Sequence, residues 1–430
     1  MIDMDLFSEL RTIYETTLLD PHTYRLTIKM KDIIDGRLLR EAVDMTMERY
    51  PYFRVCLYIK GDAISFEENP AEVPVIHTKK RISLGGEQSS GHLLAFCYWK
   101  NRLFIDAYHG LSDGGGIYPL IRTLLFYYCS SFYGKELSAE GVRLRGSVIT
   151  KEELEDPARD FICGKNSLGI KKWNKPAFQL TDSGIVRIKP DSIVYNVRIS
   201  EEEFMRFNIS NDGSPATIIA LFLARTIDAL RRDSELPTVI ALCVNQRKAL
   251  RAPLAHQSLV GDVRLLYDKK LRELPFSTQA TCFRGMVTLQ SDVDVVQDEI
   301  REYQEFVEIL KTLPGHAERQ AYCLKCMAER SRSITATVSY TGKANFGEVE
   351  RYIQEFEALP STALPSTHVP LTIEMSALHG YFFINFIQYF DEYDYFSTFL
   401  NQLRQNDIDY DVLNVVEARY PRVELPRWNL

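Results

Sequence analysis

The sequence predicts a mixed α/β protein of the α+β type, with two lobes that each consist of a mixed β-sheet carrying packed helices. The chain has 430 residues, which is too long for one simple core at about 100–200 residues per domain. Hydrophobic residues make up 45% of it and aromatic residues 11%, and this composition excludes a disordered chain. Strand pairs and amphipathic helices also follow each other in a similar order in both halves, which favours two related lobes.

The first half of the chain begins with a strand over residues 23–30, where apolar and polar residues alternate. Asp35 is a candidate N-cap for the helix that follows, and Pro51 ends that helix. The other elements expected here are two strand pairs and an amphipathic helix, at 52–59 with 63–67, 92–99 with 102–108, and 117–128.

The second half begins after residues 151–190, which show little periodicity and read as a linker or surface segment. We therefore predict an N-terminal lobe over residues 1–175 and a C-terminal lobe over residues 176–430. Ser214 followed by Pro215 opens a helix that is apolar on nearly all sides and is therefore buried. The remaining elements expected are strands at 193–199, 238–244, 334–341, 370–376 and 381–389, and helices at 292–313, 315–331 and 393–404.

Charge and apolar patterning exclude several classes of protein. The net charge is −7, from 51 basic and 58 acidic residues, which argues against a nucleic-acid-binding protein. No apolar run approaches the ~18 residues of a membrane span, and no secretory signal is visible, so we expect a cytoplasmic protein. Cys323 and Cys326 form a single C-x-x-C pair without a second pair, so we expect no metal site.

The most informative segment runs from Tyr108 to Gly116, between a predicted strand and a predicted helix. Within it, His109, Asp113 and Gly114 form the pattern His-x-x-x-Asp-Gly. An imidazole can accept a proton from an attacking hydroxyl or amine near neutral pH. The carboxylate of Asp113 could hold the loop through an arginine or orient the ring. Glycine after it lets a substrate pass close to the backbone.

Two other interpretations of this segment stay open. Gly110, Ser112 and Gly114 satisfy the nucleophile-elbow pattern of serine hydrolases and esterases, in a strand–turn–helix context. No matching acid and histidine signature follows, and no glycine-rich oxyanion segment precedes it. In the alternative without catalysis, His109 is a hydrogen-bonded structural residue, and Asp113 is the N-terminal charge of the helix.

The segment Tyr108–Gly116 is similar to the His-His-x-x-x-Asp-Gly region of the CoA-dependent acyltransferase superfamily. That group includes chloramphenicol acetyltransferase, alcohol acetyltransferases and nonribosomal peptide condensation domains. The stretches Arg49–Arg54 and Ser339–Lys343 also resemble that family. The resemblance implies two chloramphenicol-acetyltransferase-like lobes with a tunnel between them. The first histidine of the motif is Tyr108 here, so a non-catalytic, condensation-like binding protein remains an alternative.

The resemblance also implies roles for individual residues. His109 matches the general base, at the midpoint of the tunnel, and Asp113 matches a structural aspartate that pairs with an arginine, for which Arg247 is our candidate. Gly114 matches the glycine that leaves room at the tunnel. Candidate donors to a tetrahedral oxyanion are found on one predicted strand, at Ser339, Tyr340 and Thr341.

The co-substrates follow from the same resemblance. It implies an acyl-CoA or an acyl-phosphopantetheine on an acyl carrier protein as the donor, with no permanently bound cofactor. The acceptor would be a small-molecule alcohol or amine. Basic residues that could contact phosphate groups are Lys79, Lys80, Arg81, Lys171 and Lys172.

Overall fold

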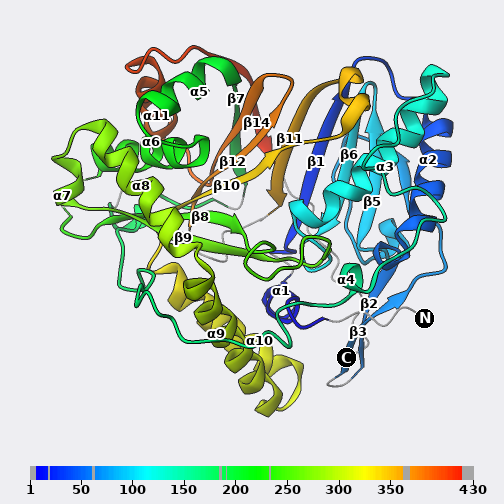
Figure 1. Cartoon of the computed structure of the whole chain (residues 1–430), viewed down its shortest axis with the longest axis horizontal. Coiled ribbons are helices and arrows are strands. Elements are labelled where there is room, and N and C mark those ends of the chain that lie inside the picture. The colour runs from blue at the N-terminus through cyan, green and yellow to red at the C-terminus, as the bar shows by residue number, and fades with distance from the viewer. Residues whose placement is uncertain are drawn as a thin grey trace.

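Two helix-covered β-sheets lie side by side and form the two lobes of the protein (Figure 1). They are seen in a computed structural model that describes residues 6–17, 20–60, 63–183, 186–189, 191–231, 234–361 and 369–418. This arrangement confirms the fold class predicted from the sequence.

The N-terminal lobe contains a five-stranded sheet whose order is β11 (Ile353–Ser361), β1 (Thr23–Met30), β6 (Arg102–Tyr108), β5 (Leu94–Trp99) and β4 (Val75–His77). The helices α2 (Gly36–Arg49) and α3 (Gly114–Tyr133) cover one face of this sheet (Figure 1). Asp35 caps α2 as predicted, because its carboxylate accepts from the backbone N–H groups of Arg37 and Leu38. A separate hairpin consists of β2 (Val55–Lys60) and β3 (Ala63–Glu68).

The C-terminal lobe contains a seven-stranded sheet. Its order is β14 (Tyr410–Ala418), β7 (Ser192–Ser200), β13 (Tyr381–Gln388), β12 (Leu371–Leu378), β10 (Ala336–Lys343), β8 (Thr238–Asn245) and β9 (Val260–Tyr267). Its core lies under four helices, α5 (Glu201–Ser210), α6 (Pro215–Leu230), α8 (Phe276–Gln290) and α11 (Asp394–Arg404). The apolar α6 is buried at the centre, and Ser214 caps it in a capping box.

Two long helices, α9 (Val293–Thr312) and α10 (Gly315–Ser331), extend below the C-terminal lobe, where α10 packs against α1 (Leu10–Glu15) (Figure 1). The short helices α4 (Lys151–Leu154) and α7 (Lys269–Arg272) lie in the connections, with 3-10 turns at Pro51–Phe53, Glu87–Ser89, Leu180–Ser183 and Gly347–Tyr352. Within the described ranges no single helix meets the length and apolarity needed to span a membrane; only α5 and α6 taken together do, and they are bent by 78°.

Strand β11 crosses from the second half of the chain into the first sheet. It pairs antiparallel with β1, from Thr23 opposite Ser361 to Met30 opposite Ile353. All strands of the seven-stranded sheet lie after residue 175, and β11 comes from the same part of the chain but belongs to the five-stranded sheet. The two lobes are therefore interleaved, and the N-terminal sheet needs a strand from beyond residue 350.

Candidate active site

The candidate site is the loop between β6 and α3, which holds the His-x-x-x-Asp-Gly residues. Tyr108, the last residue of β6, is buried, and its hydroxyl lies 2.8 Å from the hydroxyl of Thr16. A Cβ at Gly110 would lie 2.4 Å from the Tyr108 ring, so the turn needs a glycine there. The backbone N–H of His109 donates to the carbonyl of His22 at 2.7 Å. These contacts fix the backbone of His109 and therefore the point from which its ring extends.

The His109 ring is partly exposed and is held from two sides. It makes a T-shaped contact with the ring of Tyr24, with ring centroids 5.4 Å apart. Its Nδ1 atom lies 3.4 Å from the hydroxyl of Ser258, on the loop that connects β8 to β9. In the described part of the chain, Nε2 has no hydrogen-bond partner. One ring nitrogen is therefore oriented by the protein and the other is available to a ligand.

Burial in the loop lowers the pKa of His109 below its ordinary value, and the negative charge of Asp113 opposes part of this shift. A lowered pKa favours the neutral imidazole, which is the form that can accept a proton.

Asp113 caps the start of α3 and makes no hydrogen bond to the imidazole among the described residues. Its Oδ1 accepts from the backbone N–H of Gly116 at 2.8 Å. Arg247 binds both carboxylate oxygens, with distances of 2.9 Å and 2.8 Å. The backbone N–H of Leu259 donates to Oδ2 at 2.9 Å. The structure thus brings together Asp113 and the arginine predicted for it, in a bidentate pair that joins the two lobes.

The glycines after Asp113 allow close contacts with the C-terminal lobe. A Cβ at Gly114 would lie 3.1 Å from the side chain of Thr341 on β10. A Cβ at Gly116 would lie 2.1 Å from the backbone oxygen of His256. The first turn of α3 therefore packs directly against the other lobe, and Thr341 lies at this contact.

The three predicted oxyanion donors point in two directions, because side chains alternate along a strand. Thr341 faces α3, whereas Tyr340 packs against Phe382 in the core of the C-terminal lobe, with ring centroids 6.0 Å apart. Ser339 is on the same face as Thr341 and lies opposite Glu374 in the pairing of β10 with β12. Tyr340 is therefore removed from the set of candidate donors by the alternation of its strand.

Ser112 has a structural environment rather than that of a nucleophile. It is 1% exposed, and its hydroxyl donates to the backbone oxygen of His256 at 2.6 Å. A serine nucleophile must instead give its proton to a base and reach the substrate. This geometry does not support the serine hydrolase alternative.

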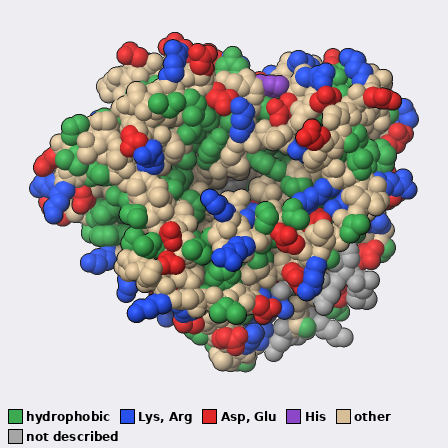
Figure 2. Space-filling view, in the orientation of Figure 1, with side chains coloured by type: hydrophobic (Ala, Val, Ile, Leu, Met, Phe, Trp, Pro, Cys, Tyr) green, Lys and Arg blue, Asp and Glu red, His purple; other side chains and the backbone are tan. Residues whose placement is uncertain are grey.

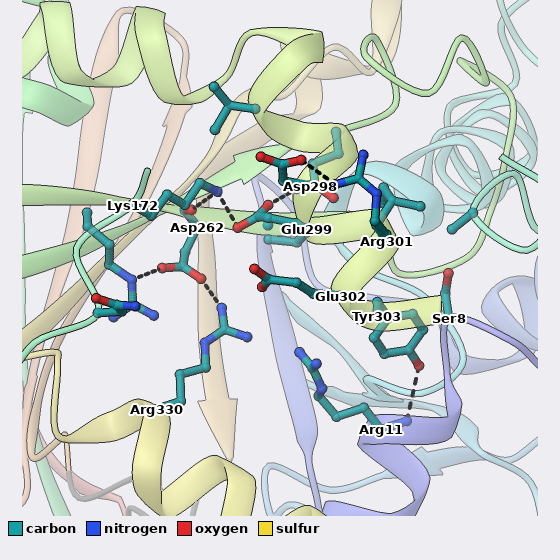
Figure 3. A pocket seen from close by; sticks show the side chains of 18 of the residues that line it. Ser8, Arg11, Lys172, Asp262, Asp298, Glu299, Arg301, Glu302, Tyr303 and Arg330 are labelled. Atoms are coloured by element: carbon teal, nitrogen blue, oxygen red, sulfur yellow. Dashed lines mark hydrogen bonds and ion pairs between the residues drawn. The ribbon is translucent and has the colours of Figure 1, made fainter. Parts of the chain in front are cut away.

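A cavity of about 830 Å³, seen from close by in Figure 3, lies near the candidate site. Ser258, which contacts His109, is part of its wall, and so are the predicted phosphate-binding candidates Lys171 and Lys172. Arg11, Glu302 and Arg330 point into it from different sides (Figure 3). Figure 2 shows that the molecule is hollowed between its two lobes, with Lys and Arg side chains just below the hollow.

The other basic candidates lie elsewhere. The backbone oxygens of Lys79 and Lys80 accept from Arg25 on β1, and Arg81 donates to the backbone oxygen of Leu359 on β11. The cavity is not lined by Lys79, Lys80 or Arg81.

Sequence reasoning did not find Ser258 or Tyr24, although both contact the His109 ring. Ser258 lies in a connection that we expected only as a loop, 149 residues after the histidine. The one signal in the sequence was that Ser258 lies close to Arg247 in the chain. If Arg247 pairs with Asp113, the loop that carries Arg247 must also reach the site.

No family model matches the chain, and no curated protein matches it. Its fold nevertheless matches solved structures over nearly their whole length. Polyketide synthase associated protein 5 from Mycobacterium tuberculosis has a TM-score of 0.59 at 14% identity, with 93% of this chain and 96% of that chain covered. The epimerization domain from the third module of tyrocidine synthetase B has a TM-score of 0.61 at 12% identity, with 94% of each chain covered.

A third similar structure is that of Fusarium sporotrichioides TRI101 complexed with coenzyme A and T-2, with a TM-score of 0.58 at 12% identity and coverage of 95% and 98%. The chain therefore has the two-lobed fold of condensation domains and acetyltransferases. The resemblance of the sequence predicted a two-lobed fold of this kind, and these structures confirm the fold.

Proposed function

We propose that the protein is an acyltransferase, which moves an acyl group from a CoA or carrier-protein thioester to an alcohol or amine. The observation that carries this proposal is the His109 ring, which is partly exposed and is contacted at Nδ1 by the hydroxyl of Ser258. Its place in a fold shared with acetyltransferases and condensation domains supports the same reaction.

His109 acts as the general base in this proposal. In the tautomer that donates from Nδ1 to Ser258, Nε2 carries the lone pair that takes the acceptor's proton. The acceptor oxygen or nitrogen then bonds to the thioester carbonyl carbon, and the carbonyl oxygen becomes an oxyanion. The C–S bond breaks as this intermediate collapses, and the leaving thiolate takes the proton back from the imidazolium. No covalent acyl-enzyme forms, and catalysis gains from holding both reactants in contact.

The other site residues have supporting roles. Asp113 and Arg247 hold the loop and the start of α3, and they do not touch the reacting atoms. Thr341, at the contact with Gly114, is our candidate donor to the oxyanion. The cavity that Ser258 helps to line is our candidate entrance for the thioester, because Lys171 in its wall suits a phosphate group.

The test is thiol release from a panel of acetyl-, hexanoyl- and palmitoyl-CoA and from acyl-phosphopantetheine on a carrier protein, with alcohol and amine acceptors. We expect His109→Ala to lower kcat at least 100-fold, since general base catalysis contributes about 10²–10⁴-fold. Ser112→Ala and labelling with a fluorophosphonate test the hydrolase alternative, and we expect no labelling. Turnover within tenfold of wild type in His109→Ala would refute the mechanism, and binding of a donor without any turnover would indicate a non-catalytic binding protein.

A further inference from the structure

Ser258, whose hydroxyl lies 3.4 Å from Nδ1 of His109, is itself held by a residue near the start of the chain. Its backbone N–H donates to Oε1 of Glu9 at 2.9 Å. Glu9 directly precedes α1 and is 249 residues away from Ser258 in the sequence. Two hydrogen bonds therefore connect Glu9 to the His109 ring through a single residue.

The backbone on both sides of Ser258 is held as well. The peptide group between Gln257 and Ser258 has its oxygen bound to the Arg247 guanidinium at 2.6 Å, while its N–H donates to Glu9. In the next peptide group, the N–H of Leu259 donates to Asp113 at 2.9 Å. A rotation of the Ser258 backbone would break at least one of these bonds. Together they define the direction in which the Ser258 hydroxyl extends.

Glu9 is a buried carboxyl of which only one oxygen is used. The residue is 2% exposed, and among the described residues its Oε2 atom has no hydrogen-bond partner. A buried polar atom without a partner costs free energy. Stability alone therefore does not explain a glutamate at this position, and such exceptions are expected at functional sites.

The environment of Glu9 favours an action through geometry and not through charge. Burial raises the pKa of Glu9 well above its ordinary value, and the hydrogen bond from the Ser258 backbone opposes part of this shift. A raised pKa favours the uncharged carboxyl. The uncharged carboxyl still has an oxygen that accepts from the Ser258 N–H, and the side chain of glutamine has an equivalent oxygen.

The segment that carries Glu9 has anchors of its own. The backbone oxygen of Phe7 accepts from the hydroxyl of Tyr303 on α9 at 2.8 Å. Ser8 donates to Asp156 from its backbone N–H at 2.6 Å and from its hydroxyl at 2.9 Å. Because these contacts do not involve the Glu9 side chain, a substitution of Glu9 should leave the segment in place and remove only the contact with Ser258.

We propose that Glu9 is a positioning residue for His109. By holding the backbone of Ser258, it keeps the Ser258 hydroxyl where it accepts the proton on Nδ1, so that the lone pair of the imidazole stays on Nε2. When Nε2 takes a proton from the acceptor, Nδ1 keeps its own proton and its contact with Ser258. The effect of Glu9 on the reaction rate rests on the acyltransferase function proposed above, whereas its effect on the tautomer of His109 does not.

The first measurement determines that tautomer. The full-length protein is labelled with ¹⁵N in its histidine rings and studied by NMR above the ordinary pKa of histidine, where the ¹⁵N shift of each ring nitrogen shows whether it carries a proton. His109→Ala identifies the signal of His109 among the eight histidines. We expect the proton on Nδ1 in the wild type and in Glu9→Gln. In Glu9→Leu and in Ser258→Ala the population should shift towards the form with the proton on Nε2.

The second measurement is a double-variant cycle in kcat, with the acyl-CoA of the panel that gives the fastest His109-dependent thiol release. Glu9→Leu and Ser258→Ala should each lower kcat about tenfold, since a catalytic group that is misplaced slightly loses part of its effect. The double variant should lose no more than the more damaged single variant, because both substitutions remove the same contact. Glu9→Gln should stay within about twofold of the wild type, as should the KM for the acyl-CoA in every variant.

Asp156→Asn is the matched control. Asp156 is another buried carboxyl that holds the same segment, but its hydrogen bonds come from Ser8 and Ala158 and not from Ser258. This control should change neither the tautomer of His109 nor kcat. Glu9→Ala is made alongside as a second variant without an acceptor oxygen, and thermal unfolding shows which variants are folded.

The outcomes distinguish this inference from the function on which it partly rests. Absence of His109-dependent thiol release would refute the acyltransferase function, and the tautomer would then decide the role of Glu9 by itself. If that release persists, an unchanged tautomer in Glu9→Leu and Glu9→Ala, or losses in kcat that multiply in the double variant, would overturn the role of Glu9 alone. Equal losses in Glu9→Gln and Glu9→Leu, or in Asp156→Asn and Glu9→Leu, would overturn it too.

Discussion

The pair between Asp113 and Arg247 gives the sharpest prediction about stability. Asp113 is 1% exposed and Arg247 6%, so the ion pair is buried at the interface between the lobes. Removing one partner of such a pair costs about 3–5 kcal/mol, because the remaining charge stays buried without compensation. In Arg247→Met, Asp113 would keep the backbone N–H groups of Gly116 and Leu259 as donors. We therefore expect a loss near the lower limit, about 3 kcal/mol.

The assay is urea denaturation of the single variants Arg247→Met and Asp113→Asn and of the double variant. Because Asp113→Asn removes the charge that Arg247→Met leaves unpaired, the double variant should lose at least about 2 kcal/mol less than the sum of the single losses. Arg37→Met is the control, since its pair with Glu41 is largely exposed and should contribute about 0–1 kcal/mol. A loss below about 1 kcal/mol in Arg247→Met, or additive losses in the cycle, would refute this account of the pair.

Two further predictions concern packing and pH. Gly116→Ala should destabilise the protein by about 3 kcal/mol or more, because the new Cβ would lie 2.1 Å from the backbone oxygen of His256. Gly285→Ala in α8 should instead stabilise the protein by about 0.5–1 kcal/mol, because the space around the new Cβ is open. Thermal unfolding of both variants checks this, and similar effects of the two would contradict it. Because burial lowers the pKa of His109, we expect kcat/KM not to change with the protonation of this residue at any pH above the ordinary histidine pKa. On the acid side kcat/KM should fall, because the protonated ring cannot accept a proton. A pH–rate profile with an acid limb above pH 7 would contradict this.

The elements that the sequence predicted well are those whose pattern is local. Strand β1 shows a clear alternation of residues, and α2 has a capping residue and a terminating proline, so both were predicted nearly to their ends. Helices α9 and α10 have apolar stripes of sufficient length to identify them without knowledge of their partners.

The elements that were missed depend on contacts that are distant in sequence. Strand β11 begins at the end of a 3-10 turn and mixes acidic with apolar residues, and its partner β1 is more than 300 residues away in the chain. Strands β9 and β14 and helices α5 and α8 were likewise absent from the prediction. Such segments acquire their structure from the surface on which they pack, which a local pattern does not contain.

The candidate site shows the same division. The motif residues His109 and Asp113 lie four residues apart in one segment, and Arg247 could be proposed because the resemblance implies an aspartate that pairs with an arginine. Ser258 reaches the site only through the docking of the lobes, and the sole signal for it in the sequence is its proximity to Arg247. Strand alternation would have separated Tyr340 from Ser339 and Thr341 before the structure was known.

The crossing of β11 has a consequence for how the protein is made. At about 5–20 residues per second, the time between synthesis of β6 and synthesis of β11 is on the order of 10–50 s. During that time β1 has β6 on one side and an open edge on the other, and an open edge can pair with other chains. A nascent chain that stops before residue 353 would keep this edge exposed however well its remaining strands had folded. Ribosome stalling, truncation or slow codons in the second half of the gene should therefore cause aggregation through the first sheet, although most strands of that sheet are encoded in the first half.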